Sequence, residues 1–358
     1  MPEAVDAPVA PTAAKAAEEE PAALVISHRF DPGPPGGPPY QATIRLTGHR
    51  TGLAIPATAR DTFMVTQLIT GVVPGSGPMS TTNSVYGIAS GDWDVRAEVI
   101  GPERARVANP AHLEAVGWSW RRRSLIPAPG LAKTRWALTA PLAATPGVVR
   151  GSFFAAAAIA LAGAVLVQPF FLAHHGVPVG TAISVSVIAM ILGLVGAKAW
   201  YMALKGPSLA TLREGWSVDG FLVSAPAIAI VAALLVGVPV GGYLDAVAPP
   251  IFLAVAVGRV GCFLTGCCAG RMTAGRGIWS SDRRVGARRI PAQLIESALG
   301  VALALAASAL VFGRVAEGTG LVFVGSIAAY AAARQMLLRL RAESRQFSWR
   351  RAGRTSAA

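Results

Sequence analysis

The chain has 358 residues, of which 53% are hydrophobic and only 14% are charged, and its formal net charge is +13. Because a soluble globular domain carries about 25% charged residues, this composition excludes an ordinary soluble protein and indicates an integral membrane protein. The positive charge is then expected mainly in loops and tails, where it favours contact with anionic lipid. A nucleic-acid partner is disfavoured because no binding motif accompanies the charge.

The N-terminal part of the chain is predicted to lie outside the bilayer. Residues 1–22 are rich in Ala, Pro and Glu, and such a segment cannot bury enough apolar surface to fold. We therefore predict a disordered tail there, and no signal peptide is recognisable in it. Residues 23–100 hold runs that alternate between apolar and polar residues and predict a small β-sandwich-like soluble domain. The runs are Gln41–Leu46, Thr62–Ile69 and Trp93–Ile100.

Residues 101–150 are predicted to be a juxtamembrane connector. They combine tryptophans such as Trp118 and Trp120 with a run of three arginines, Arg121–Arg123. Tryptophan and arginine together are typical of a membrane interface. An ordinary solvated loop would explain the same composition.

Six apolar segments follow, and each is long enough to cross the hydrocarbon core of a bilayer. They are Ser152–Leu172, Thr181–Leu204, Gly220–Val238, Ala246–Leu264, Leu294–Phe312 and Thr319–Leu338. Residues 151–340 are therefore predicted to be a transmembrane domain, and residues 341–358 a basic tail that lies on anionic headgroups. The predicted fold class is an all-α transmembrane helix bundle of about six spans, preceded by a small β-rich soluble domain.

Several ionisable or polar side chains lie within these apolar segments or at their ends, where charge is costly. Arg259 and Arg334 lie inside two segments, Gln293 and Glu296 lie at the start of another, and Asp219 precedes a third. Ion pairs that fix the helix register would explain them. A functional explanation is that two arginine forks from different helices hold the phosphate of an anionic phospholipid. Asp219 would then be a candidate base.

The most distinctive segment is GRVGCFLTGCCAG, which spans Gly258–Gly270. Its glycines allow the backbone to bend and a headgroup to approach closely, but they do not explain Arg259. The segment also holds all three cysteines of the chain, Cys262, Cys267 and Cys268. These are interpreted as small apolar packing residues, with a redox-active or lipid-acylated thiol as the alternative. A zinc site is disfavoured because no histidine is close in sequence.

This segment resembles the pattern G-R-x-G-N-F-x-N-G-E-x-x-G of bacterial prolipoprotein diacylglyceryl transferases. The matching residues are Gly258, Arg259, Gly261, Phe263, Gly266 and Gly270. Further stretches follow the family's order: Gly196–Tyr201, Glu214–Gly220, Pro291–Glu296, and Tyr330 with Arg334. The resemblance covers roughly residues 150–340. The departures are Asp219 in place of a histidine, Cys262 and Thr265 in place of asparagines, and Cys267 in place of a glutamate.

The resemblance implies an enzyme of the bacterial plasma membrane that acts in lipoprotein biosynthesis. It would move a diacylglyceryl group from phosphatidylglycerol, or a related anionic phospholipid, to the lipobox cysteine of a preprolipoprotein. Arg259 and Arg334 would be catalytic and clamp the phosphate, and Asp219 would take the role of base. The implied substrate-binding residues are Gly258, Gly261, Cys262, Gly266, Gly270, Gln293, Glu296 and Tyr330. No metal and no organic cofactor is implied.

Two non-enzymatic functions stay open at this point. The arginines would also suit a transporter or lipid-binding protein, although no inverted repeat is visible, and the β-rich domain would suit an interaction protein. The membrane orientation is open as well. The connections 173–180, 239–250 and 313–318 together hold a single Arg or Lys, Arg314, and the connections on the opposite side are rich in arginine. The positive-inside rule therefore predicts cytoplasmic termini, whereas the resembled enzymes have an external N-terminus.

Overall fold

The computed structural model describes residues 22–53, 58–100, 113–115, 131–133, 135–137, 140, 145–213 and 215–342. The predictions of a disordered N-terminal tail (Ala22 apart), of a basic C-terminal tail and of most of the connector concern residues outside these ranges. The chain divides into two units. One comprises Met1–Phe153, Cys262–Gln293 and Arg339–Ala358, and the other comprises Phe154–Gly261 and Leu294–Leu338.

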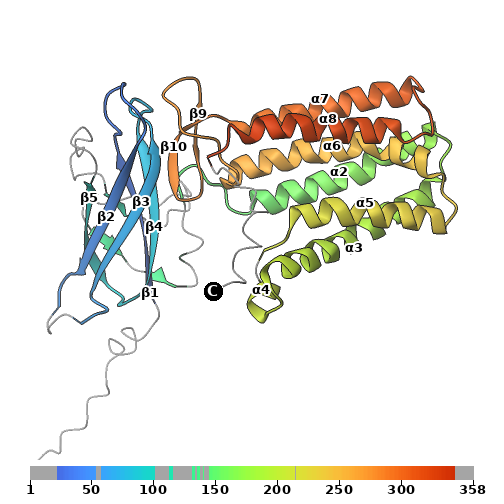
Figure 1. Ribbon diagram of the computed structural model, residues 1–358. Coiled ribbons are helices and arrows are strands. Elements are labelled where there is room, and N and C mark those ends of the chain that lie inside the picture. Colours follow the sequence, from blue (N-terminus) through green and yellow to red (C-terminus); the bar gives the residue numbers. More distant parts are fainter. Residues whose placement is uncertain are drawn as a thin grey trace, which may run out of the picture. The chain divides into compact units, whose positions relative to one another are not determined.

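The first unit contains two β-sheets (Figure 1). One sheet has the strand order β6–β1–β4–β10–β9, with β8 also paired to β1, and the other has the order β3–β2–β5–β7. The strands are β1 Ala22–Phe30, β2 Tyr40–Arg50, β3 Thr62–Val72, β4 Met79–Ile88, β5 Asp92–Ile100, β6 Leu113–Ala115, β7 Leu131–Lys133, β8 Arg135–Trp136, β9 Ile278–Ser281 and β10 Val285–Arg289. Neighbouring strands run antiparallel.

One hydrophobic core is shared by the two sheets. Along β2, the alternation that predicted a strand places Ala42, Ile44 and Leu46 in this core, and each is fully buried. Trp93 on β5 is also fully buried, and its indole N–H donates to the carbonyl oxygen of Ala89 at 3.2 Å. The period of two therefore arises because one face of each sheet packs inward.

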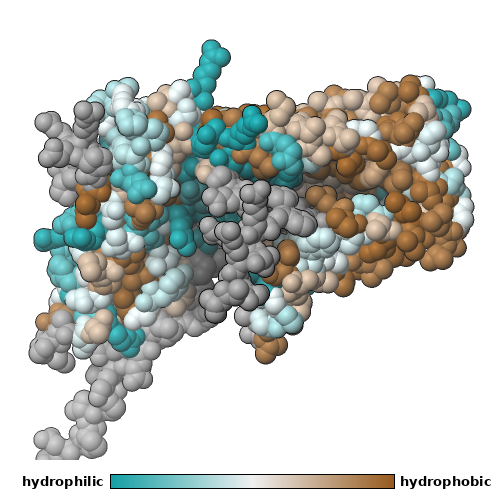
Figure 2. Space-filling view, viewed as in Figure 1, coloured by the Kyte–Doolittle hydropathy of each residue, from teal (hydrophilic) through white to brown (hydrophobic). Residues whose placement is uncertain are grey.

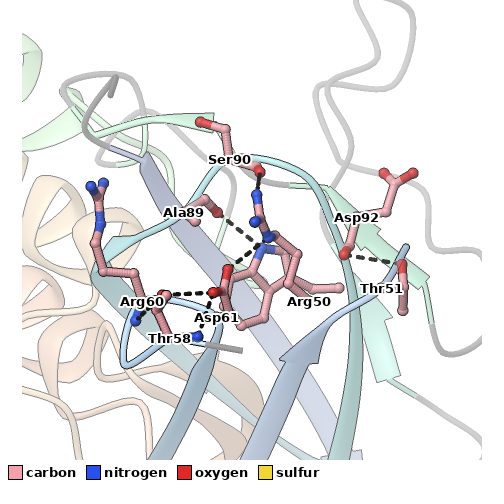
Figure 3. A network of polar contacts seen from close by, with 9 residues as sticks. Arg50, Thr51, Thr58, Arg60, Asp61, Ala89, Ser90 and Asp92 are labelled. Carbon is pink, nitrogen blue, oxygen red and sulfur yellow. Dashed lines mark hydrogen bonds and ion pairs between the residues drawn. The ribbon is translucent and has the colours of Figure 1, made fainter. Parts of the chain in front are cut away.

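A polar network fixes the loops at one edge of this unit (Figure 3). Nε of Arg50 lies 2.7 Å from Oδ1 of Asp61 in an ion pair that is largely buried. The other carboxylate oxygen of Asp61 accepts hydrogen bonds from the backbone N–H and the hydroxyl of Thr58, at 2.8 and 2.6 Å. Arg50 also donates to the carbonyl oxygen of Ser90 at 2.9 Å. The network therefore ties the end of β2 to the loops that precede β3 and β5.

Strands β9 and β10 come from a distant part of the sequence, the connection between helices α6 and α7. Strand β10 pairs with β4, with Val285 opposite Thr81 and Gly286 opposite Ser80. Val285 and Ala287 are buried in the core that the two sheets share. The hairpin therefore extends the sheet formed by the N-terminal residues and contributes to its core.

The helices lie at α2 Ser152–His174, α3 Val179–Lys205, α4 Leu209–Arg213, α5 Val218–Leu235, α6 Val240–Thr265, α7 Ala292–Phe312 and α8 Leu321–Leu338. Within the described residues, five are long and apolar enough to cross a membrane, and α5 contains a shorter apolar stretch, Gly220–Leu235. Large apolar side chains gather on the helix surfaces (Figure 2). Phe154 and Leu235, for example, are 78% and 81% exposed. This surface suits contact with lipid tails.

Helix α6 begins at Val240, earlier than the predicted start at Ala246, and it continues through Pro249 and Pro250. The earlier start places Asp245 inside the helix, where its side chain is fully buried. Its carboxylate accepts hydrogen bonds from the backbone N–H groups of Gly320, Val322 and Phe323 at 3.0, 3.0 and 3.3 Å. Asp245 thus satisfies donors at the start of α8 that would otherwise be unpaired in an apolar environment.

Candidate functional site

Close packing between α6 and α7 positions the first part of the candidate site. The hydroxyl of Ser297 donates to the carbonyl oxygen of Ala256 at 2.8 Å. A Cβ added to Gly300 would come within 3.0 Å of the backbone N of Ala256, so this position requires a glycine for the helices to approach so closely. Arg259 lies one turn beyond Ala256, and Glu296 one turn before Gly300. The two helices therefore bring these side chains face to face.

The carboxylate of Glu296 is the centre of a cluster drawn from three helices. Its Oε1 lies 2.8 Å from Nη2 of Arg259 and 3.5 Å from Nη1 of Arg334. The same oxygen accepts a hydrogen bond from the hydroxyl of Tyr330 at 3.0 Å, and Arg334 donates to that hydroxyl at 3.2 Å. Tyr330 and Arg334 lie one turn apart on α8, so a single helix face presents both.

The cluster is shielded from solvent and positively charged. The side chain of Glu296 is 1% exposed, and those of Arg259 and Arg334 are 13% and 19% exposed. Two guanidinium groups against one carboxylate leave a formal charge of +1 on these three groups. Because charge in an apolar helix bundle is costly, this arrangement is suited to an anion such as a phosphodiester.

The end of α6 is shaped by a glycine that ends the helix. Gly266 has a φ of +72°, a conformation that favours glycine. Its N–H donates to the carbonyl oxygen of Phe263, and the N–H of Cys267 donates to that of Cys262, at 3.2 and 3.0 Å. This is the Schellman pattern of helix termination. The side-chain amide of Gln293, at the start of α7, donates to the carbonyl oxygen of Cys267 at 2.9 Å and holds the turn.

Three positions at which the sequence departs from the transferase pattern make internal contacts. The hydroxyls of Thr265 and Ser152 share a hydrogen bond of 2.7 Å, and Sγ of Cys267 donates to the carbonyl oxygen of Cys262 at 3.6 Å. Hydrogen bonds to the thiols of Cys262 and Cys268, with burial, raise the pKa of the Cys267 thiol. A protonated thiol is a poor nucleophile and a poor metal ligand, which favours a packing role for Cys267. Among the described residues, no group of three or more His, Cys, Asp or Glu is placed to hold a metal ion.

Asp219 lies in the first turn of α5, whose N-cap, Ser217, accepts a hydrogen bond from the N–H of Gly220 at 3.1 Å. The side chain of Asp219 is outside the described part of the chain, so its predicted role as a base remains a prediction. Lys198 occupies the position of an arginine in the transferase pattern. Its Nζ donates to the carbonyl oxygens of Thr211 and Gly215 at 2.8 and 3.1 Å, and thereby ties α3 to the connection before α5.

The structure thus brings Arg259, Glu296, Tyr330 and Arg334 together, as sequence reasoning grouped them. Gly258 and Gly261 lie on α6 beside Arg259, and Cys262 lies in the last turn of α6. Gly266 and Gly270 lie in the connection to α7, and Gln293 lies at the start of α7. Sequence reasoning missed Ser297 and Gly300. The sequence feature that could have predicted them is the occurrence of small residues near Glu296 in an apolar helix, a pattern common at helix contacts.

Five long apolar helices, with a carboxylate that holds two arginines among them, define a multi-pass membrane protein with a charged cluster inside its helix bundle. A family model described as prolipoprotein diacylglyceryl transferase matches residues 151–357, and the chain belongs to this family. Two similar proteins, from two strains of Dehalococcoides mccartyi, are named phosphatidylglycerol–prolipoprotein diacylglyceryl transferase. Each is 32% identical over 96 residues, which cover 25% of this chain and 37% of the relative. No solved structure matches the chain.

Proposed function

We propose that the protein is a transferase of the bacterial plasma membrane that moves a diacylglyceryl group from phosphatidylglycerol to a cysteine thiol of a prolipoprotein. The observation that carries the proposal is the convergence of Arg259 and Arg334 on one oxygen of Glu296. Membership of the transferase family supports the reaction type. The curated relatives support the substrates by their names, although this chain covers only about a third of their length.

The cluster would act on the phosphate of the donor lipid. The single negative charge of the phosphodiester balances the formal charge of the two arginines and Glu296. As the bond from the diacylglyceryl carbon to the phosphate oxygen breaks, negative charge grows on the departing glycerol phosphate. Guanidinium groups that Glu296 and Tyr330 hold in place stabilise this charge without having to reorient. The arginines therefore lower the barrier for departure of the leaving group.

The chemical step is a substitution at one carbon. The sulfur of the acceptor cysteine forms a bond to the diacylglyceryl carbon, and the bond from that carbon to the phosphate oxygen breaks. The electron pair of the broken bond leaves with glycerol phosphate, and the thiol proton passes to a base. We propose Asp219 as this base because it takes the place of the family's histidine in the stretch Glu214–Gly220.

The pairing of β4 with β10 supports six membrane crossings. It requires the N-terminal sheet and the connection between α6 and α7 to lie on the same side of the membrane. Between them the chain passes through α2, α3, α5 and α6, and only an even number of crossings returns it to the starting side. Since α2, α3 and α6 are long enough to cross, we propose that the shorter α5 crosses as well.

A transfer assay tests the proposal. The full-length protein in liposomes would be given labelled phosphatidylglycerol and a peptide with a single cysteine. We expect wild-type transfer and a loss of at least about a hundredfold in Arg259→Ala, since charge-stabilising groups typically contribute that much. Arg314→Ala, in an exposed arginine of the α7–α8 connection, is the matched control and keeps wild-type activity. Lipid binding that depends on Arg259 but yields no transfer would identify an anionic-lipid binder or transporter instead.

A further inference from the structure

Strands β9 and β10 form a hairpin that lies between two parts of the transferase motif. The segment Gly258–Gly270 precedes it in the chain, and Gln293 follows it closely. The hairpin strands pair with each other through Gly286–Arg289 and Ile278–Ser281. The position of this hairpin therefore constrains the backbone that precedes it, up to Gly270, and the backbone that follows it, from Ile290 to Gln293.

The hairpin is attached to the N-terminal sheet by several independent contacts. The N–H of Thr82 on β4 donates to the carbonyl oxygen of Arg284 at 2.7 Å, and the indole N–H of Trp279 donates to that of Pro78 at 3.1 Å. Val285 and Ala287 lie in the core with residues of β1 and β4. Buried apolar contacts and backbone pairing together make this attachment cooperative.

Arg289 connects the hairpin to the motif. Its side chain is 1% exposed, and its Nη1 donates to the carbonyl oxygen of Gly270 at 3.1 Å. Its Nη2 donates to Oδ2 of Asp282 at 2.7 Å and to the carbonyl oxygen of Val285 at 3.3 Å. The planar fork of arginine suits these diverging acceptors, whereas the ammonium group of lysine does not reproduce its geometry.

Gly270 fits its position tightly. A Cβ on this residue would overlap the carbonyl oxygen of Ile290, which directly follows β10. The N–H of Ile290 donates to the carbonyl oxygen of Arg271 at 3.0 Å. A shift of β10 therefore moves the backbone at Gly270, because no free space separates the two segments.

We propose that the N-terminal β-domain is a positioning module for the α6–α7 connection, which it holds through β10 and through Arg289 as the positioning residue. The statement that this connection serves a lipid-processing site rests on the proposed function. The attachment of the connection to the β-domain does not depend on that function. If the β-domain holds the connection in this way, a change confined to the β4–β10 contact should loosen the backbone of residues 266–271 and weaken the binding of phosphatidylglycerol.

Gly286→Ala is the first test. An added Cβ would lie 2.5 Å from Oγ of Ser80 and from the ring of Trp279, so these two side chains must give way and the packing between β10, β4 and β9 is disturbed. Gly275→Ala is the matched control in the same connection, since its Cβ would meet only Thr273, at 3.5 Å. Hydrogen exchange of the full-length protein would be followed at the amides of residues 266–271. We expect protection to fall about tenfold in Gly286→Ala, as for a moderate packing clash, and to stay unchanged in Gly275→Ala.

Arg289→Lys is a second, independent test that does not rely on a steric clash. The lysine keeps the positive charge near Asp282 but cannot hold all three acceptors, so protection at Gly270 falls while the strands of the N-terminal sheet stay protected. In the transfer assay, both Gly286→Ala and Arg289→Lys are expected to raise KM for phosphatidylglycerol more than they lower kcat. Unchanged exchange at residues 266–271 in both variants would overturn the proposal. If wild-type protein shows no transfer while exchange responds as expected, the positioning role stands and the transferase function fails.

Discussion

At the level of single residues, Oε1 of Glu296 is the atom on which the candidate site depends. It receives Arg259, Arg334 and the hydroxyl of Tyr330. If one of these three groups is removed, we expect the other two to stay near Glu296 but to change their orientation. A buried carboxylate that loses a hydrogen bond also retains the cost of its desolvation.

Tyr330→Phe tests this arrangement with the smallest possible change. We expect transfer to fall at least about tenfold, because one hydrogen bond to a charged group contributes about 1.5–3 kcal/mol. Steady-state kinetics in liposomes of phosphatidylglycerol would measure the effect. Tyr40→Phe, which removes a hydroxyl that donates to Pro32 in the first unit, is the control. Equal activity of both variants would mean that Tyr330 does not orient the arginines.

Asp61 makes the first unit sensitive to acid. Hydrogen bonds from Thr58, and the charge of Arg50, hold the pKa of this carboxyl below its usual value of 3.8. A pKa that is lower in the folded state adds stability that is fully present above the unfolded pKa and is lost as the pH falls through the folded pKa. The contribution is therefore complete above about pH 4 to 5 and disappears below that range.

Asp61→Asn should show this dependence. At neutral pH we expect hydrogen-exchange protection of β2 and β3 to fall about tenfold, the equivalent of a hydrogen bond to a charged group. The difference from wild type should shrink as the pH is lowered below 4. Asp94→Asn, in a more exposed ion pair with His49, is the control and should change little. A difference that persists unchanged into acid would refute the assigned role.

At the level of helices, Asp245 connects α6 to the first turn of α8. Asp245→Ala removes the acceptor of three N–H groups, so we expect the first-turn amides of α8 to exchange at least about tenfold faster. Because α8 carries Tyr330 and Arg334, transfer should fall as well. Ser217→Ala, which removes the N-cap of α5, is the matched control for the exchange measurement and should speed exchange only in α5. Unaltered exchange in α8 would show that the cap is dispensable.

The elements differ in how well the sequence predicted them. Strands β2, β3 and β5 were predicted because one face is buried and the other exposed. Strand β1 was missed because its residues are buried on both faces apart from Arg29, so no alternation is visible. Strands β9 and β10 were missed because they are short, because β10 ends in two arginines, and because β10 pairs with a strand some 200 residues earlier. Contacts so distant leave no local pattern.

The candidate site was largely predictable from motifs. The family pattern singled out Tyr330 with Arg334 and the stretch Pro291–Glu296, and the cost of charge in apolar segments singled out Arg259. The structure places these side chains close together, and their roles remain a prediction. The role of Arg289 was not predictable, since it is one of several arginines in the connection and only its burial distinguishes it. Asp245 was missed because the predicted helix began one residue after it.

At the level of the whole molecule, the β-rich unit is built from two distant parts of the sequence, because β10 in the α6–α7 connection pairs with β4. This arrangement places that connection and the β-domain on one side of the membrane. The arginines of the connection favour the cytoplasm, and the family resemblance favours the exterior. The pairing of β4 with β10 is compatible with a cytoplasmic or an external location. It requires the two strands to lie on the same side of the membrane but does not determine which side that is.

Simultaneous analysis of both reaction products would show whether the protein transfers a diacylglyceryl group. Wild-type protein would be incubated with phosphatidylglycerol and a cysteine peptide, and the peptide mass and the released glycerol phosphate would be quantified together. We expect equimolar amounts, with one diacylglyceryl group gained on the cysteine for each glycerol phosphate released. Release of glycerol phosphate with an unmodified peptide, or no release at all, would contradict the proposed transfer.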